Sequence, residues 1–123
     1  MQDGRRRLVG VVDDDAAVRD SLRFLLEAAN FMVVTFHSAG HFLADSDRND
    51  LACLLLDHHM PEMTGLELLR RLRRTRGKLP IALMTGSPSA QLSRQALELG
   101  ATVVLEKPLA EQALFDFVGN TGI

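Results

Sequence analysis

The sequence predicts a doubly wound α/β domain, in which a mostly parallel five-stranded sheet carries helices on both faces. Five short apolar runs alternate along the 123 residues with segments whose apolar residues recur every three or four positions, as strands alternating with amphipathic helices do. The runs are apolar throughout rather than at every second residue, which is typical of parallel strands buried on both faces. A chain of this length is expected to form one domain with a normal hydrophobic core.

The first two strands and helices are expected between residues 7 and 44. Residues 7–13 (RLVGVVD) form a valine-rich strand, and the apolar spacing over 16–29 predicts an amphipathic helix. Residues 31–36 (FMVVTF) form the second strand. Ser38 then begins a short helix, because a serine oxygen can accept a hydrogen bond from a free N–H of the first turn.

The middle of the chain contains the third strand, the third helix and the fourth strand. Residues 51–57 (LACLLLD) and 79–85 (LPIALMT) are the two strands. Between them, Thr64 and Glu67 have the spacing of a capping box, in which each side chain accepts a hydrogen bond from the other residue's backbone N–H. The box predicts a helix that continues through Leu72.

The last part of the chain completes the alternation. A helix is expected from about Ala90 to Gly100, since glycine is the preferred residue just past a helix end. Residues 102–107 (TVVLEK) form the fifth strand, and residues 110–118 form a short final helix. Five strands alternating with five helices favour a parallel sheet over an antiparallel one.

Composition excludes several classes of protein. The formal net charge of -2 argues against a nucleic-acid binder, which carries a basic excess. Cys53 is the only cysteine, so no disulfide framework forms, and we expect it to be a small buried hydrophobe. The apolar run 8–12 is too short for a signal peptide, and no run has membrane-spanning length. We therefore expect a cytoplasmic domain that does not bind membranes.

Polar side chains follow four of the predicted strands where each strand ends. Asp13 and Asp14 follow the first strand, Asp57 ends the third, Thr85 ends the fourth and Lys107 ends the fifth. In an open parallel sheet, ligands bind outside the carboxyl ends of the strands. These five residues are therefore expected to meet at one edge of the sheet.

The chemistry of this group is coherent. Three crowded carboxylates repel one another unless a cation lies between them, and oxygen ligands without a thiolate suit Mg²⁺. A carboxylate such as that of Asp57 can also act as a nucleophile and form an aspartyl phosphate. Lys107 would balance the charge of a phosphoryl group, and the hydroxyl of Thr85 would donate to it. The residues predict a metal-assisted phosphoacceptor site.

Four motifs together resemble the receiver domain of two-component response regulators. The resemblance covers about residues 8–118 and implies a flavodoxin-like fold with strand order 2-1-3-4-5. The motifs are "VVDDD" after the first strand, "LDHHMPEMTG" after the third, "LMTG" after the fourth and "EKP" after the fifth.

The resemblance implies a role for each matching residue. Asp57 would accept a phosphoryl group from a sensor histidine kinase, a phosphotransfer protein or a small phosphodonor. Thr85 would be the switch hydroxyl and Lys107 the lysine that pairs with phosphate, followed by a cis bond to Pro108. The domain would signal by changing conformation, without transforming a free metabolite, and so would not be an ordinary enzyme.

The resemblance also implies the ligands of the Mg²⁺ site. Asp13 and Asp14 would form its acidic pair, with Asp14 favoured as the direct ligand. Asp57 and the backbone carbonyl of His59 would complete the protein ligands.

Three positions depart from the family pattern or vary within it. Val104 occupies a position where relatives carry a tyrosine or phenylalanine, so the aromatic part of the switch is missing or replaced. His59 and Ser87, two residues beyond Asp57 and Thr85, resemble tuning sites for phosphoryl lifetime. His59 would either hinder the approach of water or form a hydrogen bond with the phosphoryl group.

Other functions fit the sequence less well. A degenerate receiver, acting as a phosphorylation-independent interaction module, is the alternative that Val104 leaves open. A hydrolase of the haloacid-dehalogenase type needs a second aspartate where His59 stands, and a dinucleotide-binding domain needs a glycine-rich turn after the first strand. His37 and His41 have helical spacing but lack further zinc ligands. The basic run 70–78 is expected to be the solvated face of the third helix.

Residues 1–123 are expected to form a single receiver domain, either standing alone or cut from a longer regulator. The resemblance implies that the fourth helix, fifth strand and fifth helix form a face for a homodimer or an output partner.

Overall fold

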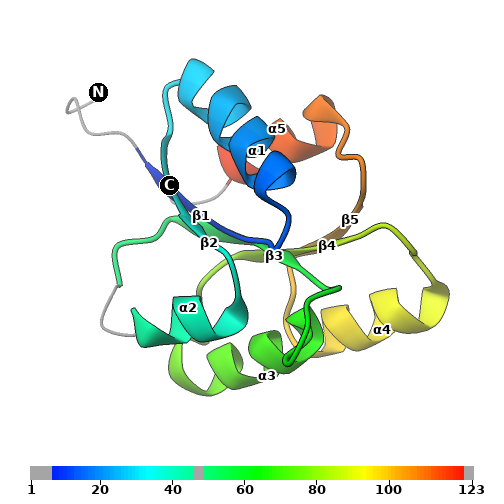
Figure 1. The fold of residues 1–123 in the computed structure, drawn as a ribbon. Coiled ribbons are helices and arrows are strands. Elements are labelled where there is room, and N and C mark those ends of the chain that lie inside the picture. The colour runs from blue at the N-terminus through cyan, green and yellow to red at the C-terminus, as the bar shows by residue number, and fades with distance from the viewer. Residues whose placement is uncertain (1–6, 46–48, 121–123) are drawn as a thin grey trace.

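A parallel sheet lies at the centre of the computed structural model, which describes residues 7–45 and 49–120. Its strands have the order β2-β1-β3-β4-β5, so the predicted flavodoxin-like order is confirmed (Figure 1). The chain begins with the inner strand β1, adds β2 at one edge and then continues with β3, β4 and β5 on the other side of β1. The strands are β1 (Leu8–Val12), β2 (Met32–Phe36), β3 (Cys53–Asp57), β4 (Ile81–Thr85) and β5 (Val103–Glu106).

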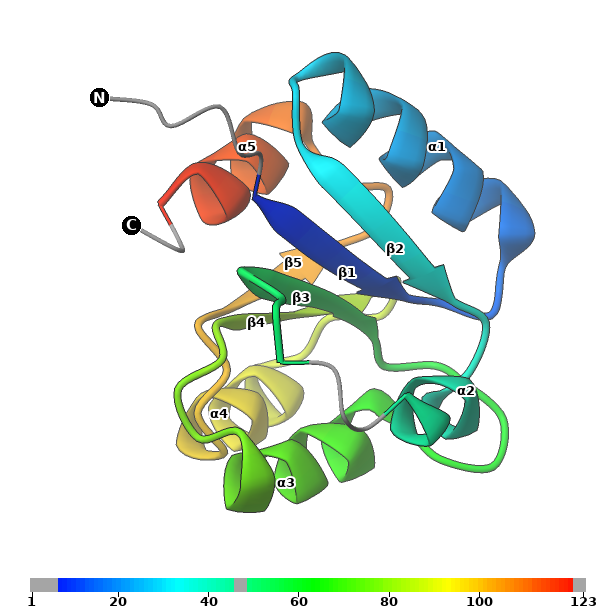
Figure 2. The ribbon, with the colours of Figure 1, turned by 90° about the vertical axis from the view of Figure 1, so that its left-hand side faces the viewer.

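Five helices of the described residues cover the two faces of the sheet. Figures 1 and 2 show α1 and α5 on one face, and α2, α3 and α4 on the other. The helices are α1 (Ala16–Ala28), α2 (Ala39–Ala44), α3 (Gly65–Thr75), α4 (Ala90–Glu98) and α5 (Glu111–Gly119). None of the helices in the described part of the chain is long and apolar enough to cross a membrane.

The helix starts follow the capping residues that the sequence predicts. Ser38 accepts a hydrogen bond from the N–H of His41, and the capping box of Thr64 and Glu67 is present with both of its bonds. Helix α3 ends at Thr75, three residues beyond the predicted Leu72. The residues added are two arginines and a threonine, which lack the conformational cost of glycine or proline and so allow the helix to continue.

Two separate hydrophobic cores lie on the two faces of the sheet. Alternate residues of each central strand enter different cores: Leu54 and Leu56 of β3 pack towards α2, α3 and α4, whereas Cys53 and Leu55 pack towards α1 and α5. All four side chains are fully buried, so Cys53 is the small buried hydrophobe that was expected. This double burial is the reason why the strands read as continuous apolar runs. Each buried leucine stabilises the fold by roughly 1.5–3 kcal/mol.

Gly65 allows α3 to begin directly against the end of β3. A Cβ atom at this position would lie 2.5 Å from the carbonyl oxygen of Asp57 and 2.8 Å from Cα of His58, which is closer than real Cβ contacts come. The N–H of Gly65 donates to the carbonyl of His58 at 3.0 Å. The glycine in the motif after β3 therefore fixes the path of the loop that carries Asp57.

Arg73 corrects the prediction that residues 70–78 form only a solvated face. Its guanidinium donates to three carbonyl oxygens, those of Arg76 at 2.9 Å, Leu79 at 2.8 Å and Gly100 at 2.9 Å. Burial lowers the pKa of Arg73 from its usual value. Arg73 therefore acts as a clamp between three backbone segments that lie close together. Arg70, Arg71 and Arg74 are exposed, as predicted. The clamp joins the ends of α3 and α4 to the start of β4.

Candidate functional site

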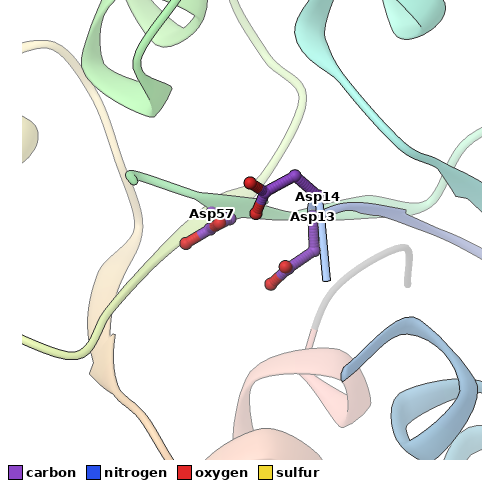
Figure 3. A group of neighbouring side chains, drawn as sticks. All are labelled: Asp13, Asp14 and Asp57. Carbon is purple, nitrogen blue, oxygen red and sulfur yellow. The ribbon is translucent and has the colours of Figure 1, made fainter. Parts of the chain in front are cut away.

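Three aspartates from two strand ends converge at the carboxyl edge of the sheet. Asp57 is the last residue of β3, and Asp13 and Asp14 directly follow β1 (Figure 3). One carboxylate oxygen from each aspartate lies within 4.8 Å of those of the other two, and no other part of the described chain brings together three potential metal-ligating side chains. Asp13 and Asp57 are buried, whereas Asp14 is exposed. The strand ends meet as the sequence predicts.

Lys107 balances part of this negative charge. Its ammonium donates to Oδ2 of Asp13 at 2.7 Å and to Oδ1 of Asp57 at 3.0 Å. Burial by itself lowers the pKa of Lys107, but the hydrogen bonds and charges of the two aspartates outweigh that effect and raise it. The lysine is therefore positively charged, and it contacts two of the three carboxylates. The following peptide bond to Pro108 is cis, as expected.

The surroundings of Asp57 shift the pKa of its carboxyl group in opposite directions, and the net effect is a rise. Burial raises its pKa, and the charge of Asp13 adds to the rise, against the opposing hydrogen bond from Lys107. Oδ1 accepts from Lys107 and, at 3.3 Å, from the backbone N–H of His59. Oδ2 accepts no hydrogen bond from any residue that the structure describes, so its lone pairs are free.

Two hydrogen bonds hold Asp13 in the loop after β1. The N–H of Asp15 donates to Oδ1 of Asp13 at 2.9 Å, and Arg19 donates to its carbonyl oxygen at 2.7 Å. Asp15 itself is the N-cap of α1 and accepts from the N–H of Ala17. Asp14 lies between these two fixed residues and is exposed, which leaves its carboxylate available to a ligand from solution.

The donor set fits a hard divalent cation. Three carboxylates supply oxygen atoms only, and a single lysine leaves an excess of negative charge, so a cation would be attracted and could be held by Asp13, Asp14 and Asp57. Mg²⁺ as that cation, and the backbone carbonyl of His59 as a further ligand, stay predictions.

Thr85 ends β4 with its side chain fully buried. Its Oγ1 accepts from the N–H of Ser87 at 3.0 Å and lies 3.0 Å from Nε2 of His59. Sequence reasoning missed this contact between His59 and Thr85. The only signal was that His59 and Ser87 each stand two residues beyond a strand-end site residue.

Two further sequence features have structural explanations. Val104 of β5 is half-buried and packs against the core on the face of α2, α3 and α4. The rings of His37 and His41 stack with centroids 4.3 Å apart, and Nδ1 of His41 accepts from the N–H of His37. No third metal-ligating side chain joins the two histidines within the residues that the structure describes.

The fold and this edge define a class of protein: flavodoxin-like α/β domains with an acidic pocket at the carboxyl ends of the strands. The family model of the response regulator receiver domain matches residues 9–118, and the chain belongs to that family. The resemblance stated from the motifs is confirmed.

Individual relatives agree with the family. The chain is 42% identical over 104 residues to the transcriptional regulatory protein FixJ of Bradyrhizobium diazoefficiens, covering 85% of this chain and 51% of that protein. It is 40% identical over 115 residues to the transcriptional regulatory protein TdiR of Thauera aromatica, covering 94% and 51%. Among solved structures, the chemotaxis protein CheY4 of Vibrio cholerae superposes with a TM-score of 0.88 at 25% identity, covering 96% of this chain and 100% of that one. The chain spans about half the length of the curated relatives it matches.

Proposed function

We propose that this receiver domain accepts a phosphoryl group on Asp57 and signals through the change that follows. The observation that carries the proposal is the placement of Asp57, a buried carboxylate at a strand end with Lys107 at 3.0 Å and two further aspartates around it. A group with this surrounding charge is suited to nucleophilic attack on a phosphorus atom whose own charge is balanced nearby.

Each residue has a part in the transfer. Oδ2 of Asp57, which accepts no hydrogen bond from the described residues, attacks phosphorus, while Oδ1 is held by Lys107 and the His59 N–H. When the donor is a phosphohistidine, the new O–P bond forms as the P–N bond breaks, and the electron pair stays on the imidazole of the donor. Lys107 then pairs with the phosphoryl oxygens, and the Thr85 hydroxyl donates to one of them.

Asp13, Asp14 and Asp57 would hold Mg²⁺, with the backbone carbonyl of His59 as a further ligand. When bound, the cation neutralises the carboxylates and the charge that develops on the transferred group. The excess of carboxylates over ammonium groups at this edge supports a cation requirement.

The donor would be a sensor histidine kinase or a phosphotransfer protein, and the setting would be the cytoplasm. FixJ and TdiR are transcriptional regulatory proteins about twice as long as this chain, which supports a receiver that works with an output region or partner. The face of α4, β5 and α5 would make that contact or form a homodimer, and α4 carries an exposed large hydrophobic residue, Leu97. No observation on the site favours the phosphorylation-independent alternative.

The test is the intact mass of the protein after incubation with a small phosphodonor, with and without Mg²⁺. We expect one phosphoryl adduct that requires Mg²⁺ and is absent from Asp57→Asn. The matched control is Asp15→Asn, which changes a neighbouring aspartate that caps α1 and leaves the pocket residues in place. A folded protein that forms no adduct would refute the proposal.

A further inference from the structure

The hydroxyl of Thr85 already has two hydrogen-bond partners before any phosphoryl group arrives. A hydroxyl has one hydrogen to donate and two lone pairs to accept with. The backbone N–H of Ser87 can only donate, so its contact of 3.0 Å uses one lone pair of Oγ1. The remaining contact, to Nε2 of His59 at 3.0 Å, either takes the hydrogen of Thr85 or fills its second lone pair.

The surroundings of Thr85 decide between these two arrangements. Its side chain is fully buried, so water cannot accept the hydroxyl hydrogen. Within the described chain, Oγ1 has no other partner besides His59 and Ser87. A buried O–H without an acceptor is costly, so Nε2 of His59 must be the acceptor and must lack a hydrogen. The neutral imidazole then carries its hydrogen on Nδ1.

We propose that His59 is a latch that holds the Thr85 hydroxyl in the unphosphorylated protein. The inference rests on the proposed function, in which the same hydroxyl donates to a phosphoryl oxygen. A single hydrogen cannot be donated fully to both acceptors, so the phosphoryl group and His59 compete for it. The charged phosphoryl oxygen is the stronger acceptor and displaces the neutral imidazole.

The backbone ties the latch to the phosphoacceptor. The N–H of His59 donates to Oδ1 of Asp57. The loop that carries the His59 ring is therefore bonded directly to the carboxylate that would be phosphorylated. The strand-end residues Asp57 and Thr85 lie on the neighbouring strands β3 and β4. When Thr85 changes partner, the imidazole of His59 is released at the exposed end of this loop. His59 is thus a positioning residue that sets how readily the phosphorylated state forms.

Beryllofluoride, which adds to an aspartate as a stable mimic of the phosphoryl group, measures the latch at equilibrium. With saturating Mg²⁺, we expect His59→Ala and His59→Phe to bind it roughly three- to tenfold more tightly than the wild type, the effect of one neutral hydrogen bond. The phenylalanine variant keeps a ring of similar size and removes only the acceptor. In a Thr85→Val background, replacement of His59 should leave the affinity unchanged.

The outcomes separate the latch from the proposed function. A wild-type protein that forms no adduct overturns the proposed function and the latch with it. Weaker or unchanged binding by His59→Ala, or the same gain in the Thr85→Val background, overturns the latch alone. The free protein gives an independent test, because the ¹⁵N chemical shift of His59 distinguishes a bare Nε2 from a protonated one. A hydrogen on Nε2 of the neutral ring overturns the latch.

Discussion

The ammonium of Lys107 donates a hydrogen bond of 3.0 Å to the carboxylate of Asp57, across a separation of 50 residues along the chain. The same ammonium also contacts Asp13. Because both carboxylates are buried, removal of the ammonium would leave two buried negative charges uncompensated even in the absence of a phosphoryl group. Lys107 would therefore serve both the resting protein and the proposed phosphorylated one.

Lys107→Met is expected to lower the free energy of unfolding by about 3 kcal/mol in the presence of a chelator. The substitution leaves two buried carboxylates without their cation. Urea denaturation at neutral pH measures the loss, and added Mg²⁺ should recover most of it. Lys78→Met, at an exposed lysine, is the control and should change stability by less than about 0.5 kcal/mol. Equal stability of the two variants would contradict the expected role of Lys107.

Asp13→Asn and Asp14→Asn are each expected to weaken Mg²⁺ binding at least about tenfold, or 1.4 kcal/mol, because each removes one of three clustered carboxylates. Isothermal titration calorimetry gives the affinities. Asp15→Asn removes the same charge one residue further on, and asparagine is an equally good N-cap. If all three variants lost affinity alike, the effect would be general electrostatics rather than coordination.

Asp57→Asn is expected to stabilise the metal-free protein at neutral pH by about 1 kcal/mol. Because burial raises the pKa of Asp57, the ionised group is less favourable in the folded protein than in the unfolded chain. Its cost is present in full above the folded-state pKa. The cost disappears as the pH falls through that value towards the unfolded pKa of about 3.9, since the folded protein then takes up the proton first. Urea denaturation in chelator, from neutral to acidic pH, should show the two proteins converging. A gap that widens towards acidic pH would mean that the sign is wrong.

Gly65→Ala is expected to destabilise the protein by about 1–3 kcal/mol, the usual cost of an overpacked site. The added Cβ would press on the carbonyl of Asp57 and on Cα of His58, so the end of β3 has to shift. Gly119→Ala is the control, because a Cβ there meets no atom within 4 Å and alanine favours the helix. Thermal unfolding compares the variants. A Gly65→Ala protein as stable as the control would show that the loop adapts.

The convergence of Asp13, Asp57 and Lys107 could be predicted from sequence because it depends only on topology. Each residue stands at the end of an apolar run, and parallel strands bring their carboxyl ends to one edge. Helix starts were predictable for a similar reason, since a capping residue acts within its own first turn. Neither of these predictions requires knowledge of the path that a loop takes.

The contact of His59 with Thr85 and the clamp formed by Arg73 could not be predicted in this way. Both depend on how far a side chain reaches once the loops around it are placed. His59 lies beyond the end of β3 and Thr85 ends β4, so their distance follows from a turn and a rotamer. Arg73 differs from the exposed Arg74 only in its helical direction, which points it towards the chain near Leu79 and Gly100.

The three hydrogen bonds of Arg73 go to main-chain oxygens, so they depend on the path of the backbone and not on the identity of the side chains at Arg76, Leu79 and Gly100. Residues such as Leu79 can be exchanged in evolution without loss of these bonds. A single-residue insertion between Arg76 and Leu79, by contrast, would move one acceptor out of register with the others. At this end of the molecule, loop length is therefore under tighter constraint than loop sequence.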